Sequence, residues 1–212
     1  MSSLSNPFRL VMEVEVGILG AGAIGQAFAR QLTRAGVRAV IGNSRGPDSL
    51  ADTVRGLGPT ISAGTREEVV RPEIIFLAVP WRCVSEALAD LPEWNGRIVI
   101  DATNPIGPPD FRLADLGGKT SSEIVGRLVP NGRFVKAFNT LPPEILSADP
   151  HEHGGRRVIF YSGDHTPSKA EIARLIKRLG FAGIDLGGLA DGGRLQQFPG
   201  GPLPLHNLIL VE

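Results

Sequence analysis

Short apolar runs alternate with amphipathic stretches along most of the chain. Residues 14–20 form an apolar run that ends in glycine, and residues 23–36 carry apolar or small side chains at helical spacing. A strand, a turn and a helix therefore follow one another, as at the start of a βαβ unit. The same reading predicts a second helix at 46–58 and further buried strands at 37–43, 73–80, 96–105 and 132–140. Apolar strands between helices favour a doubly wound α/β fold, with a parallel sheet covered on both faces.

The pattern changes after residue 140. Residues 141–146 predict at most a short helix, and Pro167 lies in the first turn of a well-marked amphipathic helix at 166–180. Strands are expected on either side of this helix, at 156–164 and 181–188. This β-α-β segment either forms a small second α/β lobe or extends the first sheet. Irregular surface loops are expected at 110–120 and 151–155.

Composition and charge exclude several classes of partner. Of the 212 residues, 42% are hydrophobic and 21% are charged, as in an ordinary globular protein. Lys plus Arg and Asp plus Glu both number 22, so no basic field predicts a nucleic-acid or membrane partner. Cys83 is the only cysteine, which excludes an internal disulfide and favours a reducing, cytoplasmic setting. The first residues lack the pattern of a secretion signal, and Met12 is an alternative start to Met1.

A glycine-rich turn joins the first strand to the first helix. Gly20, Gly22 and Gly25 give G-x-G-x-x-G, in which the glycines permit a tight turn, close approach of a pyrophosphate and close helix–strand packing. The helix N-terminus, with Ala23 and Ile24 in its first turn, offers N–H groups and positive potential to an anion. The alternative is a glycine turn without a ligand. The position of the G-x-G-x-x-G motif within a βαβ unit favours a dinucleotide-binding Rossmann-type domain.

We therefore divide the chain into three segments. Residues 1–13 are expected to be a flexible extension, 14–140 the Rossmann domain, and 141–212 a small C-terminal lobe.

Asn43, Ser44 and Arg45 follow the second strand, where NAD-binding proteins often carry an acid that accepts hydrogen bonds from the ribose 2′-hydroxyl. Neutral donors and a guanidinium suit a 2′-phosphate instead. The sequence therefore predicts NADP(H) rather than NAD(H). The alternative is an exposed turn with Arg45 merely solvated.

Two later strand ends supply further candidates. Ala78, Val79 and Pro80 end the run at 73–80, and Thr103 and Asn104 end the run at 96–105. Ligands of α/β proteins bind beyond the carboxyl ends of the strands, so these residues are expected along the ribose or nicotinamide. Turn chemistry is an equal alternative for Asn104, because Asn-Pro starts turns without any ligand.

Proton-transfer chemistry is poorly represented. Tyr161 is the only tyrosine and is followed four residues later by His165, so a Tyr-x-x-x-Lys acid is missing. His151, Glu152 and His153 are adjacent residues in a polar glycine loop, so we predict no metal site there. A nicotinamide enzyme without a proton donor can still pass hydride to a flavin-type acceptor by positioning alone.

The motifs GILGAGAIG, IGNSRGP, LAVPW, IDATNP, VKAFNT, SGD and GRLQQFPGGPL, from about residue 14 to 207, resemble the NADPH-dependent reductases of the deazaflavin coenzyme F420. The resemblance implies a Rossmann domain with a small C-terminal lobe, usually in a homodimer. The lobe at 141–212 would close a cleft that holds the hydride acceptor, a deazaflavin, over the nicotinamide. Hydride would pass directly between nicotinamide C4 and deazaflavin C5.

Residue roles follow from the matching motifs. Ser44 and Arg45 would bind the 2′-phosphate beside Asn43. Residues implied to line the dinucleotide are Ala78, Val79, Pro80, Asn104 and Ala137. Phe138, Asn139 and Thr140, with Asn104, are candidates for the ring-facing cleft. From the residues alone, Phe138 could equally be a core residue, with Asn139 and Thr140 capping the next helix.

The acceptor is less sharply indicated than the donor. Relatives include the reductase domain of membrane ferric reductases, which pass hydride to FAD. An imine reductase related to pyrroline-carboxylate reductase and a non-catalytic NADP(H) sensor are the alternatives. The segment at 193–203 could be only a tail over the cleft.

Overall fold

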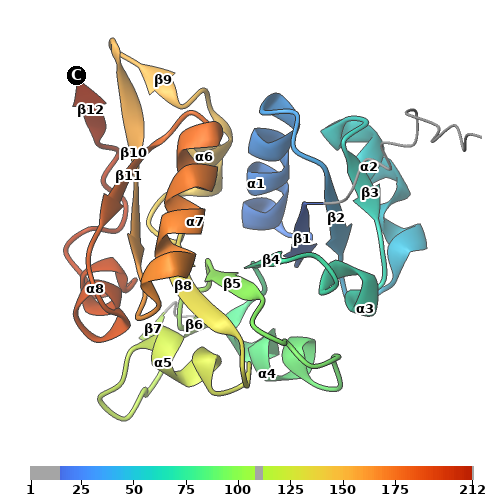
Figure 1. Cartoon of the computed structure of the whole chain (residues 1–212), viewed down its shortest axis with the longest axis horizontal. Helices are drawn as coiled ribbons and strands as arrows, with labels where there is room; N and C mark the ends of the chain where they lie inside the picture. The colour runs from blue at the N-terminus through green and yellow to red at the C-terminus, as the bar shows by residue number, and fades with distance from the viewer. Residues whose placement is uncertain (1–14, 108–111, 212) are drawn as a thin grey trace, which may run out of the picture.

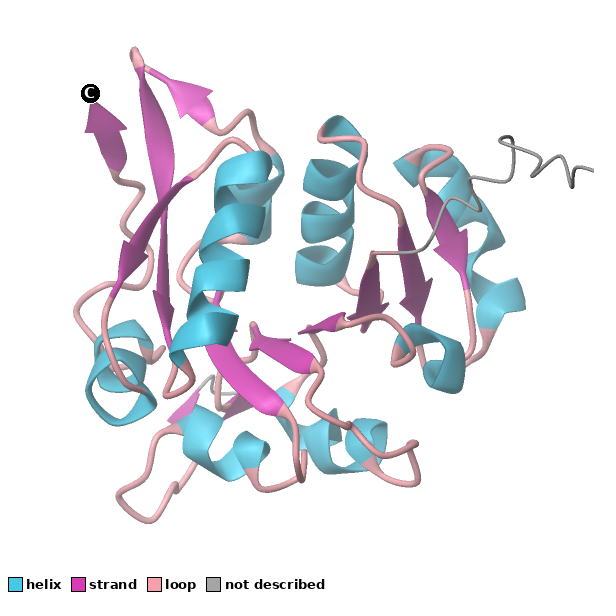
Figure 2. Cartoon of the chain, viewed as in Figure 1, coloured by secondary structure: helices cyan, strands magenta, loops and turns pink. Residues whose placement is uncertain are grey.

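A single large sheet organises the part of the chain that the computed structural model describes, residues 15–107 and 112–211 (Figures 1 and 2). Its strands are β1 Val16–Leu19, β2 Ala39–Gly42, β3 Ile61–Ala63, β4 Ile74–Leu77, β5 Ile98–Asp101, β8 Arg133–Ala137, β9 His151–Glu152, β10 Gly155–Ser162, β11 Ala182–Asp185 and β12 Ile209–Val211. Their order is β11-β10-β8-β5-β4-β1-β2-β3, with β9 and β12 paired to β10. Every pair from β8 to β3 is parallel. The predicted Rossmann-type α/β fold is confirmed.

The chain reverses direction across the sheet at β1. From β1 it winds outward through β2 and β3, then returns to β4 on the other side of β1. At such a switch point the two connections leave in opposite directions and open a crevice at the carboxyl ends of the strands. A ligand site is therefore expected between β1 and β4.

Helices cover both faces, each over its own apolar core. One core packs under α1 (Ala23–Arg34), α2 (Ala51–Leu57), α6 (Pro143–Ser147) and α7 (Thr166–Arg178). The other packs under α3 (Arg66–Val69), α4 (Val84–Leu88), α5 (Ser121–Gly126) and α8 (Leu189–Gln196). Successive residues of β4 alternate between them, with Phe76 in the first core and Ile75 and Leu77 in the second. A strand buried on both faces has this continuous apolar pattern.

Aromatic rings fill the centre of the first core. Phe28 of α1 stacks on Phe76 of β4 at 3.8 Å between ring centroids, and Phe138 meets both rings edge-on. The Phe138 side chain is fully buried. Phe138 is therefore a core residue, as one of the two interpretations of the sequence predicted, and its side chain does not face a cleft.

The segment after Thr140 adds its strands to the same sheet. β10 pairs antiparallel with β8, and α7 leads to β11, which pairs parallel with β10. Of the two arrangements left open, an extension of the first sheet is the one observed.

Both predicted irregular loops contain strands, so those expectations were wrong. At 151–155, β9 and β10 form a hairpin through His153 and Gly154, both with positive φ. Hairpin turns with positive φ at both central residues match the twist of the strands. Within 110–120, β7 (Arg112–Leu113) pairs with β6 (Ile106–Gly107). The predicted N-terminal extension and Met12 lie outside the described residues.

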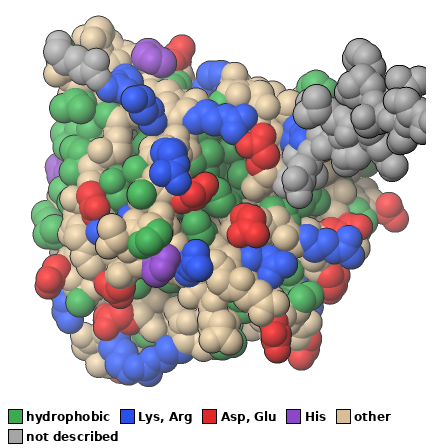
Figure 3. All heavy atoms as spheres, viewed as in Figure 1, with side chains coloured by type: hydrophobic (Ala, Val, Ile, Leu, Met, Phe, Trp, Pro, Cys, Tyr) green, Lys and Arg blue, Asp and Glu red, His purple; other side chains and the backbone are tan. Residues whose placement is uncertain are grey.

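Charged side chains of both signs are interspersed over the face seen in Figure 3, in keeping with equal numbers of basic and acidic residues. Within residues 15–107 and 112–211, no helix has the length and apolar character needed to cross a bilayer.

Candidate functional site

A pocket of about 360 Å³ opens at the switch point, between the ends of β1, β2 and β4. It gathers eight of the residues predicted for the dinucleotide from three separate segments: Gly20, Gly22, Asn43, Ser44, Arg45, Ala78, Val79 and Pro80. The sheet brings these segments together because β1 pairs with both β2 and β4.

The three glycines of the turn differ in what surrounds them. Gly20 has φ +114°, and a Cβ there would lie 2.3 Å from the Ala78 carbonyl oxygen. A Cβ on Gly25 would lie 1.9 Å from the Gly20 carbonyl oxygen. A Cβ on Gly22 would meet no atom within 4 Å. Gly20 and Gly25 are thus required by the protein itself, whereas Gly22 borders open space in the pocket.

The start of α1 has the donor set that a pyrophosphate requires. Gly22 is its N-cap, no side chain caps it, and its first turn contains no acidic residue. The first N–H groups of a helix have no partner within the helix and carry positive potential. Ala23, Ile24 and Gly25 supply these groups beside Gly22, so the turn fits the phosphates of a dinucleotide.

Asn43 shapes the turn that follows β2. Its Oδ1 accepts from the Arg45 backbone N–H at 2.9 Å, and its Nδ2 donates to Ser49 Oγ at 3.0 Å. With its amide engaged in the turn, Asn43 leaves Ser44 and Arg45 exposed at the pocket. The geometry matches a phosphate site better than a ribose-diol site, because the end of β2 provides a cation and a hydroxyl in place of an acid.

Sequence reasoning missed a second cation in the pocket. Arg66, the first residue of α3, lines it and donates from Nη1 to the Glu86 carbonyl oxygen at 2.8 Å. A capping box formed by Thr65 and Glu68 fixes the start of α3. The pattern T-x-x-E at 65–68 is the signal that could have indicated this helix start.

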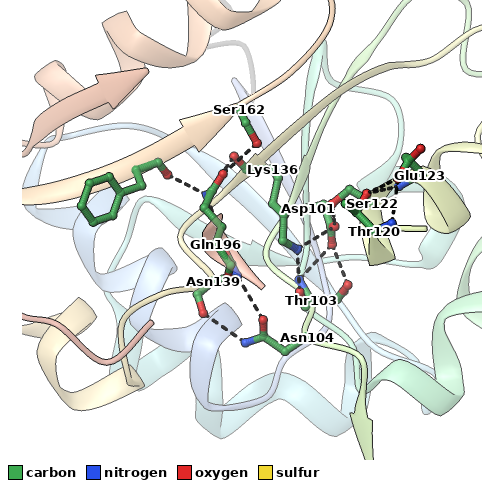
Figure 4. A network of polar contacts seen from close by, with 11 residues as sticks. Asp101, Thr103, Asn104, Thr120, Ser122, Glu123, Lys136, Asn139, Ser162 and Gln196 are labelled. Carbon is green, nitrogen blue, oxygen red and sulfur yellow. Dashed lines mark hydrogen bonds and ion pairs between the residues drawn. The ribbon is translucent and has the colours of Figure 1, made fainter. Parts of the chain in front are cut away.

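Amide side chains converge at the next strand ends, beyond β5 and β8 (Figure 4). Asn104 Nδ2 donates to the Asn139 carbonyl oxygen at 3.0 Å, and Asn139 Nδ2 donates to Asn104 Oδ1 at 3.0 Å. Gln196 of α8 contacts Asn139 from the other side. Asn104 and Asn139 therefore lie together, as candidates for one site should.

Two other candidates lie differently from expectation. Ala137 is fully buried in the first core, so its side chain lies away from the surface. Thr140 is buried and its carbonyl oxygen accepts from the Leu205 N–H at 2.7 Å. Neither Asn139 nor Thr140 caps α6, whose N-cap is Pro142, so the capping alternative was wrong.

A fully buried ion pair supports this edge. Lys136 Nζ lies 3.1 Å from Asp101 Oδ2 and donates to the Thr103 carbonyl oxygen at 2.9 Å. Asp101 also accepts from Ser122 Oγ at 2.5 Å and from Thr103 Oγ1 at 2.6 Å. Both charged groups thus have hydrogen-bond partners, and these contacts fix Thr103, the residue before Asn104.

Titratable groups nearby have structural roles. Hydrogen bonds from the backbone N–H and side chain of Thr120 lower the pKa of Glu123, which completes the capping box of α5. Burial, with the charge of Asp185, raises the pKa of Tyr161, so this phenol stays protonated. Its ring packs in the first core rather than at the strand ends.

The histidines at 151 and 153 are exposed and contact nearby carboxylates. His151 Nδ1 lies 3.4 Å from Asp149, and His153 Nε2 lies 3.5 Å from Glu152. In the described part of the chain, no three His, Cys, Asp or Glu side chains are placed to hold a metal ion.

Comparison with known proteins finds a family whose model matches the first part of the chain. The sequence model for NADP oxidoreductases described as coenzyme F420-dependent matches residues 15–105. A solved protein from Arthrobacter sp. FB24, proposed to be an F420-dependent NADP reductase, is 26% identical over 84% of this chain and 86% of that one, with a TM-score of 0.67. Residues 15–105 thus match this family of NADP oxidoreductases, and this part of the chain is a Rossmann-type NADP(H)-binding domain.

Two further proteins are similar to this chain over most of its length. A hypothetical protein from Sinorhizobium meliloti is 44% identical, with a TM-score of 0.89 over 94% of this chain and 97% of that one. Metalloreductase STEAP3 of Rattus norvegicus is 30% identical over 87% of this chain. The chain spans about 36% of the length of that curated relative.

Proposed function

We propose that the protein transfers hydride between NADP(H) and a deazaflavin or flavin-type acceptor. The observation that carries the proposal is the pocket at the β1/β4 switch point, where the α1 N-terminus lies together with two arginines, Arg45 and Arg66. The residues that line this pocket fall within 15–105, the part of the chain that matches the model for NADP oxidoreductases. NADPH, when bound, supplies the hydride from its nicotinamide ring. The protein binds the phosphates at the glycine turn and the 2′-phosphate at Ser44, Arg45 and Arg66.

The composition of the strand ends supports an acceptor that needs no protein acid. Asn104, Asn139 and Gln196 are neutral amides, and Lys136 and Asp101 are buried against each other. Amides orient rings but do not deliver protons at neutral pH. A flavin-type ring accepts a hydride, which carries both electrons, and takes its further proton from solvent.

The relatives are named for two kinds of acceptor, a deazaflavin and a metal ion. The family's description names coenzyme F420, and the curated relative from rat is named a metalloreductase. Reductive aminase from Aspergillus terreus shares the fold at 20% identity, but this chain covers only 56% of it. We therefore place deazaflavin and flavin ahead of imines.

A panel of acceptors tests the proposal. Decay of NADPH absorbance is followed with F420, FMN, FAD, ferric chelate or pyrroline carboxylate, and then again with NADH. Rapid decay with F420 or a flavin and slow use of NADH is the expected result. Decay only with pyrroline carboxylate would contradict the proposal in favour of imine reduction. Tight binding of NADPH without turnover of any acceptor would favour a sensor.

Preference for NADP(H) is expected to depend on the two pocket arginines. Arg45→Ala should weaken NADPH binding about ten- to a hundredfold, because one charge-assisted contact contributes about 1.5–3 kcal/mol. Arg66→Leu should weaken it in the same direction, and neither change should alter NADH affinity. Isothermal titration with both nucleotides measures the effect. Arg55→Ala, on the exposed side of α2, is the control. Equal losses for NADH and NADPH would contradict a 2′-phosphate role.

Cys83 provides an independent report of pocket occupancy. Its half-buried thiol lines the pocket and is the only thiol in the chain. NADPH at about a hundred times its Kd leaves only about 1% of the protein free, so alkylation should slow up to about a hundredfold. Mass spectrometry of maleimide-labelled protein measures the rate. Reduced nicotinamide mononucleotide, which lacks adenosine, should protect little, and equal protection by both would place the adenosine elsewhere.

A further inference from the structure

The amides of Gln196, Asn139 and Asn104 form a chain that leads from the core to the carboxyl edge of β5 (Figure 4). The Gln196 side chain is fully buried, Asn139 is 5% exposed, and Asn104 is partly exposed. Gln196 lies in α8, within the segment for which the sequence suggested a tail. Only the outer end of the chain can therefore meet a ligand.

The orientation of the Gln196 amide is fixed by its surroundings. Ser162 Oγ donates to Gln196 Oε1 at 2.7 Å, while Gln196 Nε2 donates to the Phe160 carbonyl oxygen at 3.1 Å. A carbonyl oxygen only accepts, so a flipped amide would place two acceptors against each other. The buried site therefore permits one orientation of Gln196.

The next two amides are oriented by both backbone and side-chain groups. The Gln196 carbonyl oxygen accepts from Asn139 Nδ2 at 2.7 Å, and Gln196 Nε2 donates to Asn139 Oδ1 at 3.3 Å. Asn139 Nδ2 also donates to Asn104 Oδ1 at 3.0 Å, and the Asn139 carbonyl oxygen accepts from Asn104 Nδ2 at 3.0 Å. Gln196 thus sets the orientation of the Asn139 amide, and Asn139 sets that of Asn104.

Asn104 retains part of its hydrogen-bonding capacity. An asparagine amide has two N–H donors and an oxygen with two lone pairs. Among the described residues, Asn139 takes one donor and one lone pair of Asn104, so one of each remains at the partly exposed end of the chain. The carboxamide of a nicotinamide ring carries both an acceptor and a donor, so it can hydrogen-bond to either of these groups.

We infer that Gln196 is a positioning residue that, through Asn139, holds the Asn104 amide in a fixed orientation to hydrogen-bond the nicotinamide carboxamide. The inference rests on the proposed function, because it takes NADP(H) as the ligand. By holding the carboxamide, Asn104 selects the face of the ring that meets the acceptor. Gln196 acts on the ring only through Asn139 and Asn104.

Binding measurements test this without requiring turnover. The probes are NADP⁺ and 2′-phospho-ADP-ribose, which lacks nicotinamide. Gln196→Glu introduces an acceptor where a donor is required, so NADP⁺ should bind about two- to tenfold more weakly, the effect of one neutral hydrogen bond. Affinity for 2′-phospho-ADP-ribose should not change. Equal weakening of both ligands would show a general structural effect and overturn the inference.

Two further variants keep the test decisive if Gln196→Glu fails to fold. Ser162→Ala removes the hydroxyl that orients Gln196. It should therefore also weaken the binding of NADP⁺ and leave the binding of 2′-phospho-ADP-ribose unchanged. Ser121→Ala is the matched control, because its buried hydroxyl has no partner within the described residues. If Ser162→Ala and Ser121→Ala have the same effect on NADP⁺ affinity, this affinity does not depend on the orientation of the Gln196 amide, and the inference fails.

A double variant and isotope transfer complete the test. Adding Gln196→Glu to Asn104→Ala should cause no further loss of NADP⁺ affinity, since both changes act through one contact. Additive losses would contradict the inference. With an active acceptor, NADPH deuterated on either face should lose strict stereospecificity in Gln196→Glu. If no acceptor is reduced by the unaltered protein, the proposed reaction fails, while the binding comparison still decides the role of Gln196.

Discussion

Replacing Lys136 with methionine is expected to destabilise the fold by about 3–5 kcal/mol, the typical cost of leaving a buried charge without its partner. Asp101 would keep its carboxylate in a site with no exposure to solvent. The Thr103 carbonyl oxygen would also lose a donor. Urea unfolding followed by circular dichroism measures the loss as a lower midpoint. Arg174→Met, which breaks an exposed ion pair with Glu171, should leave the midpoint unchanged.

A second charge removal separates electrostatics from packing. Asp101→Asn keeps an oxygen acceptor for Thr103 but carries no charge, so adding it to Lys136→Met should restore much of the lost stability. If the double variant is as unstable as the two single losses added together, the cost of Lys136→Met comes from lost packing and not from the uncompensated carboxylate.

The parallel sheet could be predicted because its signals are local. The apolar runs of β1, β2, β4, β5 and β8 are buried along most of their length and can be recognised without knowledge of their neighbours, whereas the short, partly exposed β3 was not predicted. The glycine turn is local only in part. Gly25 is required by the Gly20 carbonyl oxygen of the same strand–turn–helix unit, whereas a side chain at Gly20 is excluded by Ala78, which follows β4. The strand–turn–helix unit beside the pocket could therefore be predicted from the sequence.

The buried ion pair depends on register, which the sequence alone does not give. Asp101 and Lys136 are 35 positions apart and become partners because β5 and β8 pair with these two residues side by side. An isolated charge near the end of an otherwise apolar strand was the available signal. One acid and one base in such positions on two strands could have suggested a pair.

Short elements account for most of the remaining differences. α3 has too few residues for helical periodicity, so Arg66 could not be placed at the pocket. The hairpin at 151–155 is polar and glycine-rich, and its pairing to β10 is decided by backbone conformation. Gln196 looked like part of a tail because α8 contains two glycines, and these are buried where α8 packs closely on its neighbours.

Replacing Gly22 with valine is expected to abolish tight NADPH binding while leaving the fold intact. Gly22 has φ −75°, which suits any residue, and a Cβ there meets no protein atom within 4 Å. The new side chain would occupy the space through which the pyrophosphate approaches the α1 N-terminus. Loss of two charge-assisted hydrogen bonds of about 1.5 kcal/mol or more each predicts a loss of about a hundredfold or more in affinity.

Substitutions at two other glycines serve as controls for this experiment. Gly56→Val, in α2 and also without a nearby atom, should change neither binding nor stability. Gly25→Ala should lower the unfolding midpoint itself, because its Cβ would clash with the Gly20 carbonyl oxygen at 1.9 Å. Nucleotide titration and thermal unfolding of all three variants measure binding and stability separately. Unchanged NADPH affinity in a folded Gly22→Val variant would place the pyrophosphate away from this turn, and the proposed cofactor site would be wrong.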